Sequence, residues 1–203
     1  MSDTPEIIKP LVPGGFSRLG ELPGRQHLAL YTGANSWYRD QIIAKSHEPH
    51  ILKHTPKDAE SRFTDIVAFD KWYAKGRKLF MLANGSGELG GIVWYGKEKA
   101  PDYLKTEANH TFAIRLYEGF MGQGLGKPFM KTTLDSYMRG LTQQDLNEFG
   151  GIWLETCDDN DAAMALYPKF GFEIMANDKE RVGMVLSPES IREILSADPN
   201  PGA

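Results

Sequence analysis

Cysteine is almost absent from this chain, because Cys157 is the only one among 203 residues. A single cysteine excludes an internal disulfide framework and a thiolate metal cluster. Long apolar runs are also missing: none approaches the roughly 20 residues that a membrane-spanning helix needs. The first residues, MSDTPEIIKP, lack the apolar core of a signal peptide. We therefore expect a cytoplasmic protein with no membrane contact, in which Cys157 packs within a strand.

The chain also lacks an excess of positive charge. Its formal net charge is -4, so no broad basic field is available for nucleic acid. Hydrophobic residues make up 41% of the sequence and charged residues 25%, which is typical of an ordinary globular protein with one main domain. We expect no nucleic-acid partner.

A histidine-based metal site is not expected either. His47, His50 and His54 lie close together, but a His-Glu-x-x-His pattern starting at His47 needs its second histidine where Ile51 stands. Pro49 is expected to interrupt a helix there, so these histidines are predicted to lie in a solvated loop.

Periodicity and turn residues predict a mixed α/β protein. Residues 1–30 are predicted to be an irregular arm because prolines and glycines crowd the first 24 residues. The main domain is placed at 31–187, and a terminal helix with a tail at 188–203. Predicted helices cover 34–46, with a cap near Asn35 or Ser36, a segment from Thr55 to Gly76, 127–139 and 160–170. Predicted strands cover 78–84, 88–96, 110–117, 150–157, 172–177 and 181–187. Parallel pairing is expected where a helix intervenes, in a central sheet flanked by helices.

The stretch FMGQGLGKPFM, residues 120–130, combines glycines with the start of a helix. Gly122, Gly124 and Gly126 each destabilise the folded chain by about 0.5 to 1 kcal/mol relative to alanine. Three such residues within five positions indicate a backbone that must approach a ligand closely. Unpaired amides at a helix N-terminus bind anions, and a phosphate group is the expected ligand. Met121 and Pro128 break the P-loop pattern, and the dinucleotide fingerprint fails at its last glycine.

Together with a second motif, this stretch resembles the GNAT family of N-acetyltransferases. The strand FAIRLY is followed by Met121-x-x-Gly124-x-Gly126, a helix and the strand IWLET. The second motif then begins at Asn160 and ends at Gly171-Phe172. The resemblance covers roughly residues 55–187 and implies a GNAT fold that binds acetyl-CoA.

The resemblance also implies which residues contact acetyl-CoA. The backbone of Ile114, Arg115 and Leu116 would hold the pantetheine arm. The pyrophosphate would lie against the segment Met121, Gly122, Gln123, Gly124, Leu125 and Gly126, and Asn160 would contact the ligand further along. The family usually has Gln or Arg where Met121 stands, and methionine donates no hydrogen bond. Weaker binding is expected unless Lys127 or Lys131 supplies charge.

Three side chains are candidates for proton transfer. Glu155 matches the base of the branch resembling ribosomal-protein N-terminal acetyltransferases, and His110 aligns with a strand position that carries a catalytic acid in histone-acetyltransferase relatives. Tyr167 matches the residue that protonates the departing thiolate, although Pro168 restrains its backbone. Two of them have a structural alternative: a solvent-facing carboxylate for Glu155 and core packing for Tyr167. The choice between Glu155 and His110 stays open.

The predicted function is transfer of an acetyl group from acetyl-CoA to a primary amine by direct attack in a ternary complex. The rival is a catalytically silent acetyl-CoA-binding module. The acceptor, a small amine, a peptide N-terminus or a lysine, is not determined by the sequence, and a monomer and a homodimer are both compatible with it. Segments before residue 80 and the loop at 97–109 would select the acceptor. Aromatic side chains are expected in the core rather than in an acceptor pocket: Trp72, Trp94, Tyr95 and Trp153.

Overall fold

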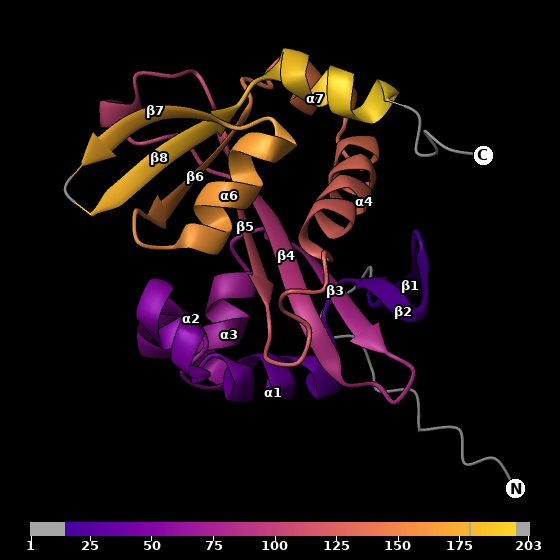
Figure 1. Ribbon diagram of the computed structural model, residues 1–203. Coiled ribbons are helices and arrows are strands. Elements are labelled where there is room, and N and C mark those ends of the chain that lie inside the picture. The colour runs from indigo at the N-terminus through magenta and orange to yellow at the C-terminus, as the bar shows by residue number, and fades with distance from the viewer. Residues whose placement is uncertain (1–14, 179, 198–203) are drawn as a thin grey trace, which may run out of the picture. The chain divides into compact units, whose positions relative to one another are not determined.

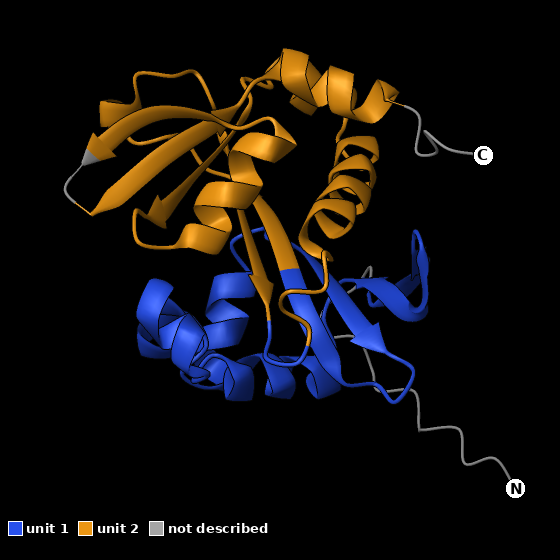
Figure 2. Cartoon of the chain, in the orientation of Figure 1, with its two compact units in different colours: residues 1–92, 117–119 blue, residues 93–116, 120–203 orange. Residues whose placement is uncertain are grey.

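The computed structural model describes residues 15–178 and 180–197. The chain forms two compact units, one from residues 1–92 and 117–119 and the other from 93–116 and 120–203 (Figure 2). Its strands form one eight-stranded mixed sheet in the order β1-β2-β3-β4-β5-β6-β8-β7. The predicted α/β class is confirmed.

Unit 1 contains an antiparallel meander and a group of short helices (Figure 1). Its strands are β1 (Ser17–Leu22), β2 (Arg25–Thr32) and β3 (Lys78–Asn84). Its helices are α1 (Ser36–Lys45), α2 (Pro49–His54), the π-helical turn η1 (Asp58–Arg62) and α3 (Ile66–Tyr73). Of the two predicted caps, Asn35 and Ser36, it is Asn35 that caps α1, by accepting a hydrogen bond from the Tyr38 amide at 2.9 Å.

The prediction of an irregular arm is wrong for residues 17–30, while residues 1–14 lie outside the described part of the chain. β1 and β2 form a hairpin, and Gly24 in its turn has a φ of +73°. Leu28 and Leu30 alternate along β2 and are both 1% exposed. This period-2 signal was masked by the surrounding prolines and glycines.

Two helix predictions in unit 1 are also wrong. Pro49 begins α2 rather than preventing it, because the first position of a helix needs no backbone donor. His50 and His54 therefore lie on a helix. The single helix expected from Thr55 to Gly76 is divided, because α3 starts anew at Asp65, which accepts a hydrogen bond from the Ala68 amide at 2.8 Å.

Unit 2 carries the other strands and the helices that follow them. β4 (Leu89–Lys97) begins in unit 1 and continues into unit 2. The remaining strands are β5 (His110–Leu116), β6 (Ile152–Cys157), β7 (Glu173–Asp178) and β8 (Arg181–Leu186). The helices are the 3₁₀ turn η2 (Asp102–Leu104), α4 (Gly126–Arg139), α5 (Gln143–Asn147), α6 (Asp161–Phe170) and α7 (Pro188–Ser196). All were predicted except η2 and α5, and α5 is held by a capping box between Thr142 and Asp145.

The two strands before and after α4 pair over a short distance only. β5 and β6 run parallel, as predicted, and pair at His110 with Ile152 and at Thr111 with Trp153. β5 continues to Leu116 without further pairing to β6, and the two strands separate (Figure 1). On its other side β6 pairs with β8 along its whole length.

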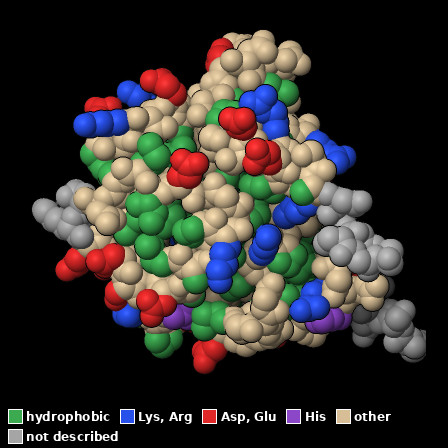
Figure 3. Space-filling view, turned by 45° about the horizontal axis from the view of Figure 1, so that its top comes forward, with side chains coloured by type: hydrophobic (Ala, Val, Ile, Leu, Met, Phe, Trp, Pro, Cys, Tyr) green, Lys and Arg blue, Asp and Glu red, His purple; other side chains and the backbone are tan. Residues whose placement is uncertain are grey.

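Figure 3 shows the distribution of charged side chains on one face of the molecule. Several basic side chains lie near one another in the centre and at the right, and acidic side chains lie mainly above them and at the lower left. Within the described residues, every helix is too short or too polar to cross a bilayer.

Candidate active site

The glycine-rich turn presents free backbone amides at the start of α4. Gly122 and Gly124 have φ values of +73° and +71°, which β-carbon-bearing residues adopt at a cost. The N–H groups of these two glycines donate to no acceptor among the described residues. They lie at the positive end of the α4 dipole, so the turn can bind an anion such as a diphosphate.

Gly126 lies close to a side chain of α6. A β-carbon there would lie 2.9 Å from Leu166 Cδ2. The missing side chain lets α4 begin against α6.

Charge near this turn comes from lysine rather than from residue 121. The Met121 side chain is 44% exposed, and Gln123 is also exposed. Lys131 donates to the Ala197 carbonyl at 2.7 Å, so its ammonium is already engaged. Lys127, in the first turn of α4, is exposed and pairs with no described carboxylate. It is the available cation closest in sequence to the turn.

The last residues of β5 lie beyond the point where β5 pairs with β6. Ile114 is buried, and Arg115 donates to the Ile114 carbonyl at 2.8 Å. The Arg115 guanidinium also stacks on the Trp94 ring at 4.8 Å. Leu116 ends the strand. These contacts fix the strand next to the glycine turn, where a ligand can align with its backbone.

Tyr167 projects from α6 into an aromatic group. Its ring meets Phe112 edge-on at 6.2 Å and lies 5.6 Å from Phe172. Only 7% of the side chain is exposed, and its hydroxyl bonds to no other described residue. Burial raises the Tyr167 pKa, and the charge of Arg115 opposes this shift. The hydroxyl therefore keeps its proton at neutral pH, as a proton donor must.

Two other residues of the second motif serve the ends of α6. The Asn160 side chain caps the helix by accepting from the Ala163 amide at 3.2 Å, which leaves its NH₂ group for other contacts. Pro168 lies within the last turn, and the helix continues past it to Phe170. Pro168 therefore does not displace Tyr167 from the helix.

Glu155 lies on β6 and is held by two residues that the sequence interpretation did not single out. Tyr103 of η2 donates a hydrogen bond to Oε1, and Arg181 Nη2 lies 3.9 Å from Oε2. Arg181 Nη1 also donates to Cys157 Sγ at 3.3 Å, so the predicted strand cysteine is in contact with the same guanidinium. The only sequence signal for Tyr103 was its place in the loop at 97–109.

His110 lies away from this group, at the paired end of β5. It is 1% exposed, and its Nδ1 lies 2.7 Å from the Tyr137 hydroxyl. Burial is the main cause that lowers the His110 pKa, with the charge of Lys97 second and Asp145 opposing. At about 3.3 Å per residue, four residues separate its Cα from that of Ile114 by roughly 13 Å.

A cavity of about 300 Å³ adjoins His110, with Lys97 and Asp145 on its wall. These two residues form an ion pair. The structure therefore groups Glu155 with Tyr103, and Tyr167 with Phe112. His110 is linked to the Phe112 ring through Tyr137 and Tyr95.

Glu155 and Tyr167 lie on opposite faces of the sheet. Thr111 pairs with Trp153, and directly paired residues point to the same face. Phe112, which contacts Tyr167, therefore points opposite to Trp153 and Glu155. The two side chains therefore lie on opposite sides of the sheet in the region where β5 and β6 cease to pair.

The four aromatic side chains proposed for the core are buried as expected, with between 1% and 8% of each exposed: Trp72, Trp94, Tyr95 and Trp153. Tyr95 stacks on Tyr137 at 4.3 Å, and the Trp153 indole donates to the Glu98 carbonyl at 2.7 Å.

This fold is the fold of the GNAT acetyltransferases, as comparison with solved structures shows. Spermidine N-acetyltransferase from Vibrio cholerae, in complex with CoA and spermine, matches with a TM-score of 0.63 and 15% identity over 83% of this chain and 99% of that one. AAC(6′)-Ib, in complex with paromomycin and acetyl-CoA, matches with a TM-score of 0.61 and 16% identity over 82% and 98%. N-acetyltransferase PseH from Campylobacter jejuni matches with a TM-score of 0.51 and 13% identity over 80% and 99%. No protein-family model and no curated protein sequence matches the chain.

Proposed function

We propose that the protein is an N-acetyltransferase that moves an acetyl group from acetyl-CoA to a primary amine. The observation that carries the proposal is the pair of free amides at Gly122 and Gly124, at the N-terminus of α4 and after the part of β5 that does not pair with β6. The fold neighbours that bind CoA or acetyl-CoA support the choice of anion.

Different segments of the chain bind different parts of acetyl-CoA in this proposal. The segment from Met121 to Gly126 receives the diphosphate, and Lys127 adds positive charge. The backbone of Ile114, Arg115 and Leu116 takes the pantetheine arm in strand-like pairing, because β6 no longer pairs with β5 beyond Thr111. Asn160 offers the NH₂ group that its capping role leaves unused.

Glu155 is the base in this proposal. At pH 7 a lysine amine with a pKa of about 10.4 is only roughly 1 in 2,500 unprotonated, a deficit of about 4.6 kcal/mol. Glu155 takes one proton from the ammonium form of the acceptor, and the lone pair freed on the nitrogen attacks the thioester carbonyl carbon. The adduct then loses its second nitrogen proton to solvent. We prefer it to His110, because His110 is 1% exposed and already engaged with Tyr137.

Tyr167 is the acid. As the carbon–sulfur bond breaks, the sulfur takes the electron pair and the Tyr167 hydroxyl gives it a proton. Solvent then reprotonates Tyr167 and removes the proton from Glu155, so the charges balance over one turnover. Cys157 is not required, since holding the two reactants together supplies several kcal/mol without a protein nucleophile.

The test is a screen for free CoA thiol across amine classes, including spermidine, spermine, kanamycin, free lysine and peptide N-termini. The multiply charged amines are included because fold neighbours are in complex with spermine and kanamycin. We expect thiol release with at least one class. Acetyl-CoA should raise the thermal unfolding midpoint, whereas NAD and ATP at the same concentration should not.

A second candidate, an acetyl-CoA-binding module without turnover, is favoured by Met121, whose side chain donates no hydrogen bond to phosphate. Thermal stabilisation by acetyl-CoA, combined with no thiol release for any amine in the panel, would select this candidate over the enzyme.

A further inference from the structure

Glu155 belongs to a row of residues that crosses three strands. It pairs directly with Gly183 on β8, and Gly183 pairs with Ala176 on β7. Paired residues point to the same face, so Gly183 and Ala176 lie in line with the Glu155 carboxylate. The row leaves space above β7 and β8 next to Glu155.

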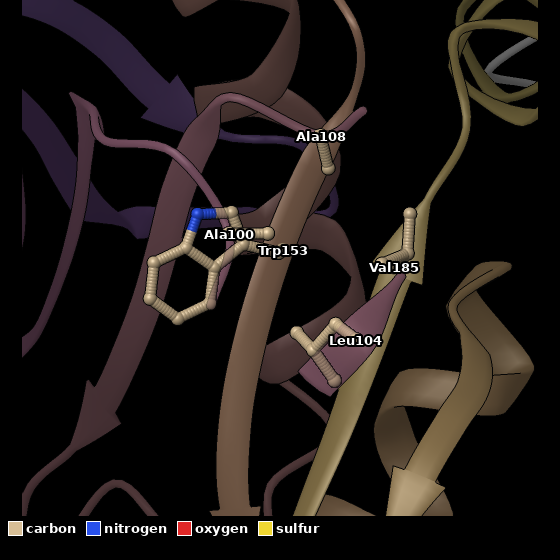
Figure 4. Packing of buried hydrophobic residues seen from close by; sticks show 5 residues of the cluster. All are labelled: Ala100, Leu104, Ala108, Trp153 and Val185. Carbon is tan, nitrogen blue, oxygen red and sulfur yellow. The ribbon is translucent and has the colours of Figure 1, made fainter. Parts of the chain in front are cut away.

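The 3₁₀ turn η2 fills this space. Its residue Leu104 belongs to a buried cluster with Ala100, Ala108, Trp153 and Val185 (Figure 4). Tyr103 and Ala176 pack against the same cluster. The turn therefore rests on the sheet through apolar contacts, with Tyr103 next to Glu155.

Gly183 makes this close approach possible. A β-carbon at Gly183 would lie 2.1 Å from Leu104 Cδ2 and 3.3 Å from the Tyr103 hydroxyl oxygen. The φ of Gly183 is not in the left-handed region, so its backbone conformation does not require glycine. Instead, Leu104 and Tyr103 of η2 occupy the space that a side chain at Gly183 would need.

The hydroxyl of Tyr103 donates to Glu155 Oε1 as a result. Hydrogen bonds from a hydroxyl to a carboxylate are among the stronger ones in proteins, and they fix the orientation of the carboxyl group. Arg181 Nη2, at 3.9 Å from Oε2, is too far for a comparable bond. Tyr103 is thus the residue that orients Glu155.

We propose that Tyr103, seated over Gly183, is a positioning residue for the reaction: it holds the Glu155 carboxylate in the orientation that accepts the proton of the acceptor amine. This inference rests on the proposed function. It assigns to the loop at 97–109 a role in turnover.

The first test is a double-mutant cycle on turnover, with wild type, Tyr103→Phe, Glu155→Gln and the double variant. The phenylalanine keeps the ring that packs on the cluster and removes only the hydroxyl. We expect Tyr103→Phe to lower kcat about tenfold with an unchanged KM for acetyl-CoA, and to cause no further loss in the Glu155→Gln background. An unchanged kcat, or an equal loss in both backgrounds, would overturn the inference.

The second test displaces η2 while Tyr103 and Glu155 keep their wild-type side chains. Gly183→Ala should lower kcat by a similar factor, and adding Leu104→Ala should restore part of it by making room for the methyl group. Gly140→Ala is the matched control, because its methyl group would meet the nearest atom, the Tyr137 carbonyl oxygen, at an ordinary 3.4 Å. Full activity in Gly183→Ala would contradict the proposal that the packing of Tyr103 over Gly183 matters for turnover. If that variant does not fold, the Tyr103→Phe cycle still decides.

Urea unfolding of the same four proteins separates this inference from the proposed function. It measures the coupling between Tyr103 and Glu155 without any substrate. Absence of coupling overturns the inference even in an active enzyme. A wild type that shows the coupling but transfers no acetyl group overturns the proposed function, and with it the part of Tyr103 in turnover.

Discussion

In the proposed mechanism, the surroundings of Tyr167 keep its hydroxyl protonated until the sulfur departs. Its ring is enclosed by Phe112 and Phe172, and burial raises the Tyr167 pKa above its ordinary value. The protonated form therefore persists at a pH where a free phenol of pKa about 10 begins to ionise.

Replacing Tyr167 by Phe tests this role. We expect kcat to fall about 100-fold at neutral pH while acetyl-CoA affinity stays the same, because the hydroxyl acts only as the thiolate leaves. Steady-state thiol release and isothermal titration measure the two quantities. Because the pKa is raised, wild-type kcat should show no loss from Tyr167 between about pH 7 and 9. Equal kcat for the two proteins throughout that range would remove Tyr167 from the mechanism.

Met121 offers a test by gain of affinity. Its exposed side chain lies at the start of the turn whose amides we assign to the diphosphate. Met121→Arg introduces a charged donor, and one hydrogen bond to a charged group is worth about 1.5 to 3 kcal/mol. Acetyl-CoA should bind at least about tenfold more tightly to this variant, by isothermal titration. Met121→Leu, which adds no donor, is the control, and a gain of the same size there would point to packing instead.

His110 links stability to pH. Burial lowers its pKa in the folded state, so below about pH 6.5 the unfolded chain binds more protons than the folded one. The free energy of unfolding should therefore decrease as the pH falls below that value. His110→Gln should lose this part of the pH dependence in urea unfolding at several pH values. An identical pH dependence in both proteins would show that other groups cause it.

At the scale of elements, the turn into α4 and the helix α6 depend on glycine at two positions. Gly124 needs a left-handed backbone, and Gly126 needs to be free of a side chain that would meet Leu166. The first requirement concerns the direction of the amides, and the second concerns the packing of two helices.

Gly124→Ala and Gly126→Ala should therefore differ in their effects. Alanine in the left-handed region costs about 1 to 2 kcal/mol, so Gly124→Ala should weaken acetyl-CoA binding as the turn relaxes. Gly126→Ala should lower the free energy of unfolding by about 1 to 3 kcal/mol through overpacking, and Leu166→Ala should relieve part of that strain. Urea unfolding and titration with acetyl-CoA measure the two effects. Wild-type affinity in Gly124→Ala would argue against the amide cradle.

At the scale of the whole molecule, ligand binding and stability are linked. A ligand that binds only the folded protein stabilises it by about 2.7 kcal/mol at 100 times its Kd. Acetyl-CoA and CoA should both raise the unfolding midpoint in a concentration-dependent way, because both carry the diphosphate. Acetate or free pantetheine at equal concentration should not. A rise with pantetheine alone would place the main recognition outside the turn.

Local sequence was sufficient for most of unit 2. Alternation of apolar residues marked β5, β6 and β8, and the capping residue Asn160 with the periodicity after it marked α6. The GNAT-like fold followed from the order of the two motifs and agrees with the solved neighbours. Unit 1 was less predictable, because Pro49 and the glycines near β1 serve helix and hairpin geometry as well as loops.

Some residues of the candidate site were proposed from the sequence, and others became visible only in the structure. The glycine turn was proposed from local backbone freedom, and Tyr167 was proposed from the resemblance to the GNAT motifs. Tyr103 was not, because its contact with Glu155 spans 52 positions of the chain and exists only where Gly183 lets η2 approach the sheet. The burial of His110 was also invisible, since it depends on Tyr137 from α4.

The sequence by itself indicated the classes of most elements and a turn at 120–126 that suits an anion, since each depends on neighbours within about one turn or strand. The resemblance to the GNAT family supplied Tyr167 as the proposed acid. Only the tertiary structure decided where β5 and β6 part, which carboxylate is oriented by a hydroxyl, and which histidine is enclosed. The physical reason is that pairing register and side-chain burial are set by residues far apart in the chain, and no local pattern encodes the distance between them.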